Sequence, residues 1–287
     1  MFILKFPVVF ILDDDYYRLV KAKWQEKRKG FLMKLLSLNI NSIRAHMDSF
    51  LKIVESGEYD TILVQELKVE DHIFPHIIFE HLGYNIKIYG QKSWNGVAVF
   101  SKHSIEDTTR GLPGYADINA RMIECVIDGR VRLINVYMPN GESIDSPKFP
   151  YKIEWMQHFT RHIEPLLNSE EPILIGGDFN VAIKDEDIWN PKQYEGSSIS
   201  APAARKIMQT WLDAGWTDCY RKFNPDTENP WTWIEYRGGS IQKNHGLRLD
   251  YWLANHTAQK LVSHCDIDKR PRLDEKPTDH CGLFLDF

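Results

Sequence analysis

An apolar strand that ends in two glycines and two polar residues is the feature that most constrains this fold. From Pro172 to Ala182 the chain reads Pro-Ile-Leu-Ile-Gly-Gly-Asp-Phe-Asn-Val-Ala. The β-branched run without polar alternation is typical of a strand buried on both faces, and the glycines leave room for a close backbone or ligand. In an extended chain, Asp178 and Asn180 would project from the same face at the strand end. The pair predicts either a functional site there or a turn in which Asp and Asn cap their own backbone.

The rest of the chain alternates short strands with helices, and Asp128-Gly129 predicts a tight hairpin. We expect strands at Lys34–Leu38, Thr61–Val64, Tyr84–Tyr89, Gly96–Phe100, Arg121–Val126, Arg130–Tyr137, Trp231–Trp233, Arg248–Leu253, Ser263–Ile267 and Gly282–Phe287. We expect helices at Ala45–Val54, Phe74–Leu82, Pro150–Leu167 and Ala201–Leu212. So many strands, with helices between only some of them, favour two sheets packed on each other with the helices outside.

Composition excludes several classes of protein. The chain has 287 residues, a net charge of −5 and four cysteines without a C-x-x-C pair, so neither a zinc site nor a disulfide framework is indicated. We therefore expect a reduced, cytoplasmic protein. Its acidity argues against a generally basic nucleic-acid binder, so binding to an acidic polymer would need a local patch or a bound cation.

The first 32 residues differ in texture from the rest. Residues 1–12 are nearly all apolar, but Asp13, Asp14 and Asp15 follow where a secretory signal would place its cleavage site. Twelve residues are also too few to span a bilayer, so no membrane association is expected. Regular alternation begins at Met33. We expect a dispensable extension over 1–32 and one catalytic domain over 33–287.

Polar side chains recur where the predicted strands end. They are Asn39, Asn41, Glu66, Tyr137, Asn140, Asp178, Asn180, Asp250, Asp279 and His280. Buried strands that repeatedly end in carboxylates and amides describe a metal-assisted active site better than unrelated caps. Hard oxygen ligands without cysteine favour Mg²⁺, with Mn²⁺ as the alternative. Phosphate chemistry is the natural use of such a site.

Seven ordered motifs also carry a resemblance. They are Leu38–Arg44, Gln65–Lys68, Asn95–Ala98, Asn135–Gly141, Gly177–Asn180, Gly246–Asp250 and Pro277–His280. The chain from Met33 onward resembles the exonuclease III family of AP (apurinic/apyrimidinic) endonucleases, within the endonuclease/exonuclease/phosphatase superfamily. The resemblance implies an α+β fold: a four-layer αββα sandwich of two packed mixed sheets flanked by helices. It also implies a DNA-repair hydrolase that cuts 5′ to abasic sites, trims 3′ ends, or does both.

The resemblance assigns roles to the strand-end residues. Glu66 would be the main Mg²⁺ ligand, with Asp279 and Asn39 close by. His280, oriented by Asp250, would contact the scissile phosphate. Asp178 would align or deprotonate the attacking water, and Asn180 would help to orient it. Tyr137 and Asn140 would contact the phosphate. Some relatives carry aspartate where this chain has Asn41, so we expect a one-metal site in which Asn41 contributes to substrate binding.

Further positions are implied on the substrate side. Trp233, Leu247 and Leu249 would line a small apolar pocket for a deoxyribose without its base, although packing in the core is an equal explanation for the aromatic Trp231–Tyr236 stretch. Arg237 lies where the family presents an intercalating side chain. The expected partner is double-stranded DNA with abasic sites or 3′ ends, bound by a monomer, at the nucleoid if the source is bacterial.

Two alternatives remain open. One is another phosphoesterase of the superfamily, acting on a phospholipid or an inositol phosphate, which shares the Asp-x-Asn and Asp-His signatures. The other is a catalytically inert DNA-binding relative, which would be marked by loss of Glu66, Asp178 or His280. None of these three residues is lost.

Overall fold

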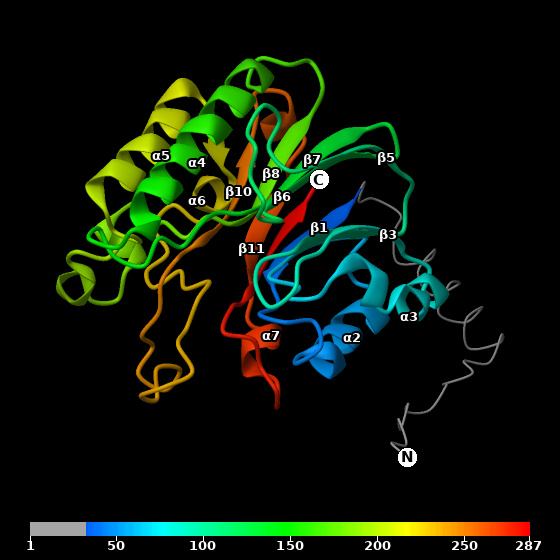
Figure 1. The fold of residues 1–287 in the computed structure, drawn as a ribbon, viewed down its shortest axis with the longest axis horizontal. Coiled ribbons are helices and arrows are strands. Elements are labelled where there is room, and N and C mark those ends of the chain that lie inside the picture. The colour runs from blue at the N-terminus through cyan, green and yellow to red at the C-terminus, as the bar shows by residue number, and fades with distance from the viewer. Residues whose placement is uncertain (1–32) are drawn as a thin grey trace. The chain divides into compact units, whose positions relative to one another are not determined.

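Two six-stranded β-sheets pack face to face in a computed structural model that describes residues 33–287 (Figure 1). The predicted extension over 1–32 lies outside the described residues. Figure 1 shows α4 and α5 covering one sheet, while α2 and α3 lie beside the other. The predicted α+β fold, with two packed mixed sheets between layers of helices, is confirmed. None of the described helices is both long and apolar enough to cross a bilayer.

The strands alternate with helices and short 3-10 turns along the chain. The strands are β1 (Lys34–Asn39), β2 (Thr61–Gln65), β3 (Asn85–Tyr89), β4 (Val97–Ser101), β5 (Ile105–Arg110), β6 (Met122–Ile127), β7 (Val131–Tyr137), β8 (Ile173–Asp178), β9 (Thr217–Asp218), β10 (Asp250–Ala254), β11 (His264–Asp268) and β12 (Gly282–Asp286). The α-helices are α2 (Met47–Glu55), α3 (His76–His81), α4 (Lys148–Ile163), α5 (Pro202–Ala214), α6 (Cys219–Phe223) and α7 (Arg270–Leu273).

The strand order brings distant segments to one edge of the sandwich. One sheet has the order β11-β12-β1-β2-β4-β3 and the other β5-β6-β7-β8-β10-β9. The pairs β1–β2 and β7–β8 are parallel, whereas β10 and β12 run antiparallel to β8 and β1. The carboxyl ends of the parallel strands therefore lie beside the amino ends of β10 and β12.

Alternating side chains divide the core into layers. One cluster fills the space between the sheets, with Leu35 and Leu63 from one sheet and Leu133, Leu174 and Trp252 from the other. A second cluster packs the opposite face of the β7–β8 sheet against α4 and α5. Strands buried on both faces have no polar alternation, which explains the continuous apolar run that begins at Ile173.

The two glycines of β8 are required by their neighbours. A Cβ on Gly177 would lie 1.9 Å from the carbonyl oxygen of Val136 on β7, and Gly177 has φ +148°. A Cβ on Gly176 would lie 2.5 Å from the Trp252 ring. The prediction that these glycines permit close approach is confirmed, and the approaching groups are a backbone and an indole.

Several predicted elements agree closely with the structure, the β6–β7 hairpin among them. Asp128 and Gly129 have φ of +54° and +61°, as a type I′ turn requires.

The predicted helix at Phe74–Leu82 was too long at its start. Phe74 precedes Pro75, takes an extended backbone (φ −70°, ψ 135°), and delays α3 until His76.

The predicted strand at Trp231–Trp233 is wrong. Trp233 forms only isolated bridges, to Leu247 and to His280, which do not extend into a ladder. The sequence analysis also missed β5, whose polar Ile-Glu-Asp-Thr-Thr-Arg sequence lies at an exposed sheet edge. Neither an apolar run nor clean alternation marks such a strand.

Candidate active site

Strand ends from both sheets meet at one edge of the sandwich. Asp178 at the end of β8 is paired with Tyr137 at the end of β7 and with Asp250 at the start of β10. Across the sandwich, Asn39 ends β1, and Glu66 follows β2. The Asn39 amide nitrogen lies 3.0 Å from Asp178 Oδ2 and 2.8 Å from Glu66 Oε1. This amide joins the two sheets at the polar cluster.

Asp178 is the most highly connected carboxylate of the cluster. Its Oδ1 accepts the backbone N–H of Asn180 at 2.9 Å, and its Oδ2 lies 3.2 Å from the Asn180 side-chain amide. Asn180 has φ +51°, so the extended geometry expected from the sequence does not occur. The residues form an Asx turn instead. The predicted turn cap is therefore present, and the second carboxylate oxygen faces the polar cluster.

Burial and neighbouring charges shape the ionisation of this carboxylate. Burial raises the pKa of Asp178 to about 7, with Asp250 and Glu66 adding to the rise and His280 opposing it. The pKa of the Tyr137 hydroxyl is well above its usual value because the group is buried beside Glu66 and Asp178. Asp178 can therefore accept a proton near neutral pH, whereas Tyr137 stays a neutral hydrogen-bond donor.

His280 lies between two carboxylates. Its Nδ1 is 2.9 Å from Asp250 Oδ2, and its Nε2 is 3.8 Å from Asp178 Oδ2. Burial alone would lower the pKa of His280, but the charge of Asp250 and its hydrogen bond raise it to about 10. The ring is consequently an imidazolium at neutral pH. Asp250 fixes its orientation, and Thr232 Oγ1 in turn accepts the backbone N–H groups of Leu249 and Asp250.

Glu66, Asn41 and Asp279 form the other side of the cluster. The Asn41 amide donates to Asp279 Oδ1 at 2.9 Å, and the Lys68 ammonium lies 2.9 Å from Glu66 Oε2. Asn41 and Glu66 have φ of +47° and +54°, a backbone region that side chains other than glycine rarely occupy. Such strained residues cluster at functional sites.

This donor set fits a hard cation. Glu66 faces a position where positive charge is stabilised, because the Lys68 ammonium already lies against it. Within residues 33–287, no three carboxylate, imidazole or thiol groups gather into a metal-binding group of their own. A cation here would thus be held by one or two carboxylates together with amides and water, which is the coordination typical of Mg²⁺.

An apolar cluster adjoins the polar one. Leu247 and Leu249 pack with Ala182 and Ile188, and Trp233 lies against this group. The Trp233 indole N–H donates to Asp279 Oδ2 at 3.0 Å. Arg237 lies further along the loop and is exposed. The structure thus brings Trp233, Leu247 and Leu249 together beside the polar cluster, with Arg237 outside it.

Asn140 completes the set predicted from the sequence. Its side-chain amide donates to Asn180 Oδ1 at 2.9 Å, and the Asn180 amide donates to the carbonyl of Met138 at 3.0 Å. The two amides therefore hold each other beside Asp178.

Sequence reasoning missed two cations at this edge. Arg121 lies 5.2 Å over the Tyr137 ring and donates to the Tyr137 carbonyl. Lys152 is fully buried beneath Asn140 and Asn180. The sequence did hold a signal for Lys152, since it takes a core position of α4, three and four residues before the buried Trp155 and Met156.

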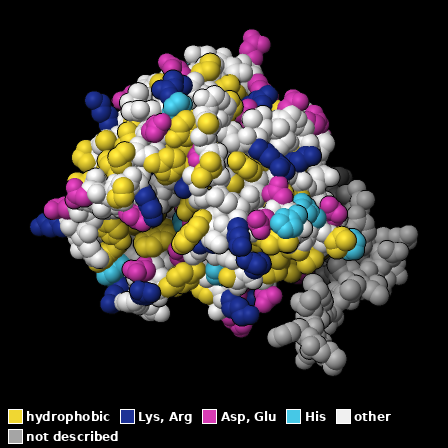
Figure 2. All heavy atoms as spheres, viewed as in Figure 1, with side chains coloured by type: hydrophobic (Ala, Val, Ile, Leu, Met, Phe, Trp, Pro, Cys, Tyr) yellow, Lys and Arg dark blue, Asp and Glu magenta, His cyan; other side chains and the backbone are white. Residues whose placement is uncertain are grey.

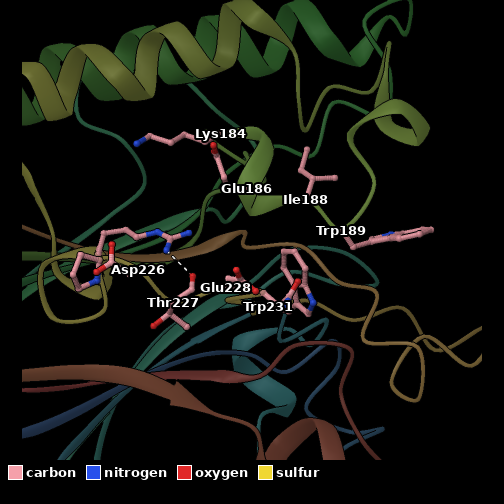
Figure 3. Close-up of a pocket in the computed structure, with 11 residues that line it drawn as sticks. Lys184, Glu186, Ile188, Trp189, Asp226, Thr227, Glu228 and Trp231 are labelled. Atoms are coloured by element: carbon pink, nitrogen blue, oxygen red, sulfur yellow. Dashed lines mark hydrogen bonds between the residues drawn. The ribbon is translucent and has the colours of Figure 1, made fainter.

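A separate pocket of about 620 Å³ opens beside the apolar cluster (Figure 3). It is lined by Lys184, Glu186, Ile188, Trp189, Arg221, Pro225, Asp226, Thr227, Glu228, Asn229 and Trp231. None of the polar strand-end residues contributes to it. Ile188 and Trp189 belong both to this pocket and to the apolar cluster, so they form a wall between the two.

The surface carries mixed charge. Figure 2 shows lysine and arginine side chains interspersed with acidic ones on the face in view. This agrees with the net charge of −5 and with binding through local contacts.

Comparison with known proteins shows which family this chain belongs to. The profile of the endonuclease/exonuclease/phosphatase family matches residues 36–280. This chain belongs to that family. It is 35% identical over 270 residues to exodeoxyribonuclease III of Haemophilus influenzae, an alignment that covers 89% of this chain and 100% of the relative.

Solved structures from the same family agree. An AP endonuclease from Archaeoglobus fulgidus superposes with a TM-score of 0.85 at 32% identity, covering 89% of this chain and 99% of that one. A Neisseria 3′ phosphatase bound to a product DNA hairpin gives 0.84 at 32% identity, with the same coverage. The predicted family resemblance and the prediction of a phosphodiester-hydrolysing enzyme are confirmed.

Proposed function

We propose that this member of the endonuclease/exonuclease/phosphatase family is a Mg²⁺-dependent DNA-repair enzyme. It hydrolyses the backbone 5′ to abasic sites, removes nucleotides and blocking groups from 3′ ends, or does both. The observation that carries the proposal is the position of Asp178, whose Oδ2 atom faces Asn39, Asn180 and the His280 imidazolium at once. A water and a phosphate held there would be next to both an acceptor and a cation.

Each residue of the polar cluster has its own role in the proposed reaction. Asp178, whose pKa is raised to about 7, accepts a proton from the attacking water, and Asn180 orients that water. The imidazolium of His280, fixed by Asp250, neutralises charge that develops on the phosphate. Tyr137 and Asn140 donate hydrogen bonds to the phosphate, and Asn41 contributes to its binding. Preorganised donors of this kind commonly supply the largest part of catalysis.

Glu66, Asp279 and Asn39 would hold the metal ion. When bound, Mg²⁺ supplies positive charge to the leaving oxygen, and Mn²⁺ can take its place. Lys68 would move away from Glu66 to make room, because both cations need the same carboxylate. We favour one metal, since Asn41 offers no charge of its own.

The apolar cluster is assigned to the abasic deoxyribose. Leu247 and Leu249 are buried, and Trp233, packed against them, is the partly exposed member that would meet a sugar without a base. Size would exclude a normal nucleotide. Exposed Arg237 would enter the duplex beside it. We expect a monomer that acts on double-stranded DNA, in the cytoplasm near the nucleoid if the source is bacterial, with residues 33–287 sufficient for activity.

A side-by-side assay tests this function. The protein is given an abasic duplex, a duplex with a recessed 3′ end, and an inositol phosphate, each with Mg²⁺ and with a chelator. We expect metal-dependent cleavage of one or both duplexes and none of the inositol phosphate. Glu66→Gln should lose that activity at low Mg²⁺ and regain part of it at high Mg²⁺. Preferential hydrolysis of the inositol phosphate would refute the assignment.

A further inference from the structure

A lysine occupies a core position where an apolar side chain would be expected. Lys152 is 0% exposed and shares the buried stripe of α4 with Trp155, Met156, Phe159 and Ile163. Burial lowers the pKa of its ammonium to about 7. A charge in such a place is costly unless it is hydrogen-bonded, so the partners of this ammonium identify what the charge stabilises.

Those partners are three backbone carbonyls from two loops. Lys152 Nζ lies 2.7 Å from the carbonyl oxygen of Asn180, 3.1 Å from that of Asn140 and 3.2 Å from that of Ser198. An ammonium has three N–H groups, so each carbonyl can receive one. The charged form alone satisfies the whole set, because a neutral amine has only two.

Two of the three carbonyls are those of Asn140 and Asn180, whose side-chain amides lie beside Asp178. The Asn140 side chain donates to Asn180 Oδ1 at 2.9 Å, and the Asn180 backbone N–H donates to Asp178 Oδ1 at 2.9 Å. Asn180 also holds a left-handed backbone, with φ +51°. The ammonium of Lys152 therefore binds the backbone carbonyls of Asn140 and Asn180, while the side chains of these two residues face the polar cluster.

We propose that Lys152 is a positioning residue for catalysis, which holds Asn140 and Asn180 in the orientation that binds phosphate and water. The proposal rests on the function proposed above. Lys152 touches no substrate in this role. It acts by fixing the carbonyl side of both residues, so its loss allows both side-chain amides to turn away.

Lys152→Met tests the role, since methionine keeps the length and apolar stem of lysine but leaves the three carbonyls without its N–H groups. A misplacement of about 1 Å can cost about 100-fold in rate, so we expect kcat on an abasic duplex to fall between about 10- and 100-fold. KM should change less than about threefold. If the methionine variant does not fold, Lys152→Gln keeps two N–H donors and serves in its place.

The matched control lies at the opposite end of β8. Buried Asn255 donates to the carbonyls of Leu166, Ser169 and Glu171, and its Oδ1 accepts the N–H of Ile173. Asn255→Leu therefore removes a comparable set of buried hydrogen bonds far from the site. We expect it to lower the unfolding midpoint in urea at least as much as Lys152→Met, with kcat unchanged.

A double-mutant cycle separates positioning from general loss of packing. If Lys152 acts through Asn140 and Asn180, adding Lys152→Met to the Asn140→Ala/Asn180→Ala variant should lower kcat by less than about threefold more. Multiplicative losses, an unchanged kcat in Lys152→Met, or an equal loss in Asn255→Leu would each overturn the proposal.

A readout without substrate keeps this test independent of the proposed function. The side-chain NH₂ signals of Asn140 and Asn180, assigned by alanine substitution, should shift or broaden in Lys152→Met but not in Asn255→Leu. Signals unchanged in Lys152→Met would refute positioning. A wild-type protein that cleaved no DNA would refute the proposed function instead, and the NMR comparison would still decide the role of Lys152.

Discussion

Trp233 donates its indole N–H to Asp279 Oδ2 at 3.0 Å, so the apolar cluster is tied directly to a carboxylate of the polar site. Burial would raise the pKa of Asp279, but the charge of His280, this bond and the Asn41 amide hold it below its usual value. A residue assigned to sugar selection thereby also fixes a proposed metal ligand. We therefore expect substrate fit and catalysis to be linked at this contact.

Trp233→Phe should separate the two roles. The aromatic ring remains in the apolar cluster, but the Asp279 carboxylate loses the hydrogen bond that it accepts from the indole. Because a hydrogen bond to a charged group is worth more than a neutral one, we expect kcat/KM on an abasic duplex to fall about 10-fold. Trp231→Phe is the matched control, because the Trp231 indole donates to the Asn244 carbonyl instead. Steady-state kinetics at several Mg²⁺ concentrations measure the difference. Equal effects of the two substitutions would contradict the link.

Asp178 combines a structural and a chemical role that two substitutions can distinguish. Asp178→Asn retains an oxygen that can accept the Asn180 N–H but removes the proton acceptor, whereas Asp178→Ala removes both. We expect each to lower Mg²⁺-dependent cleavage by roughly 10² or more. Asp178→Ala should also lose about 1 kcal/mol of unfolding free energy with the Asn180 N–H bond, measured in urea. Asp178→Asn keeps that bond but turns its NH₂ group toward the amides of Asn39 and Asn180, so its loss comes from that contact instead. Near-normal turnover by either variant would argue against Asp178 as the base.

The Asp250–His280 pair predicts a pH dependence of stability. The pKa of His280 is raised from about 6.5 to about 10, so the folded protein binds this proton more tightly than the unfolded chain. The resulting stabilisation is fully present below pH 6.5 and is lost as the pH rises toward 10. Asp250→Asn removes the main cause of the rise and should flatten the urea midpoint between these pH values.

The same substitution should be visible at the ring itself. Imidazole NMR signals of His280 should titrate at a lower pH in Asp250→Asn than in the wild type. Glu106→Gln, on the exposed edge strand, is a control that should leave both curves unchanged. A titration of His280 in the ordinary range in the wild-type protein would contradict the predicted coupling.

Much of the fold could be predicted from local patterns. Apolar runs such as Ile173–Ile175 and turn residues such as Asp128-Gly129 act within a few residues, so the sequence displays them directly. Strands β5 and β9 could not be found in this way. They are edge strands, one with a polar sequence and one of only two residues, and each is held by pairing to a single inner strand.

The site shows the same division. Strand-end carboxylates and amides identify the cluster because parallel strands bring their ends together. The sequence could not reveal that Asn180 adopts a left-handed backbone, or that the Trp233 indole reaches Asp279. The first follows from a turn that the sequence offered only as one alternative, and the second joins segments 46 residues apart. Lys152 could be predicted in part. The sequence shows a lysine among the apolar positions of α4, but only the structure shows which groups it contacts.

Gly177 offers a test of the backbone that supports the site. A methyl group added there would lie 1.9 Å from the Val136 carbonyl oxygen, and backbone atoms cannot give way without moving β7 away from β8. We expect Gly177→Ala to destabilise the protein by at least about 3 kcal/mol and to reduce its soluble yield. Gly114→Ala is the control, because Gly114 has φ +74° but no neighbour within 4 Å of the added carbon. It should cost only about 1–2 kcal/mol of backbone strain. Urea unfolding of both variants measures the difference, and similar midpoints would show that β7 can shift to accommodate the methyl group.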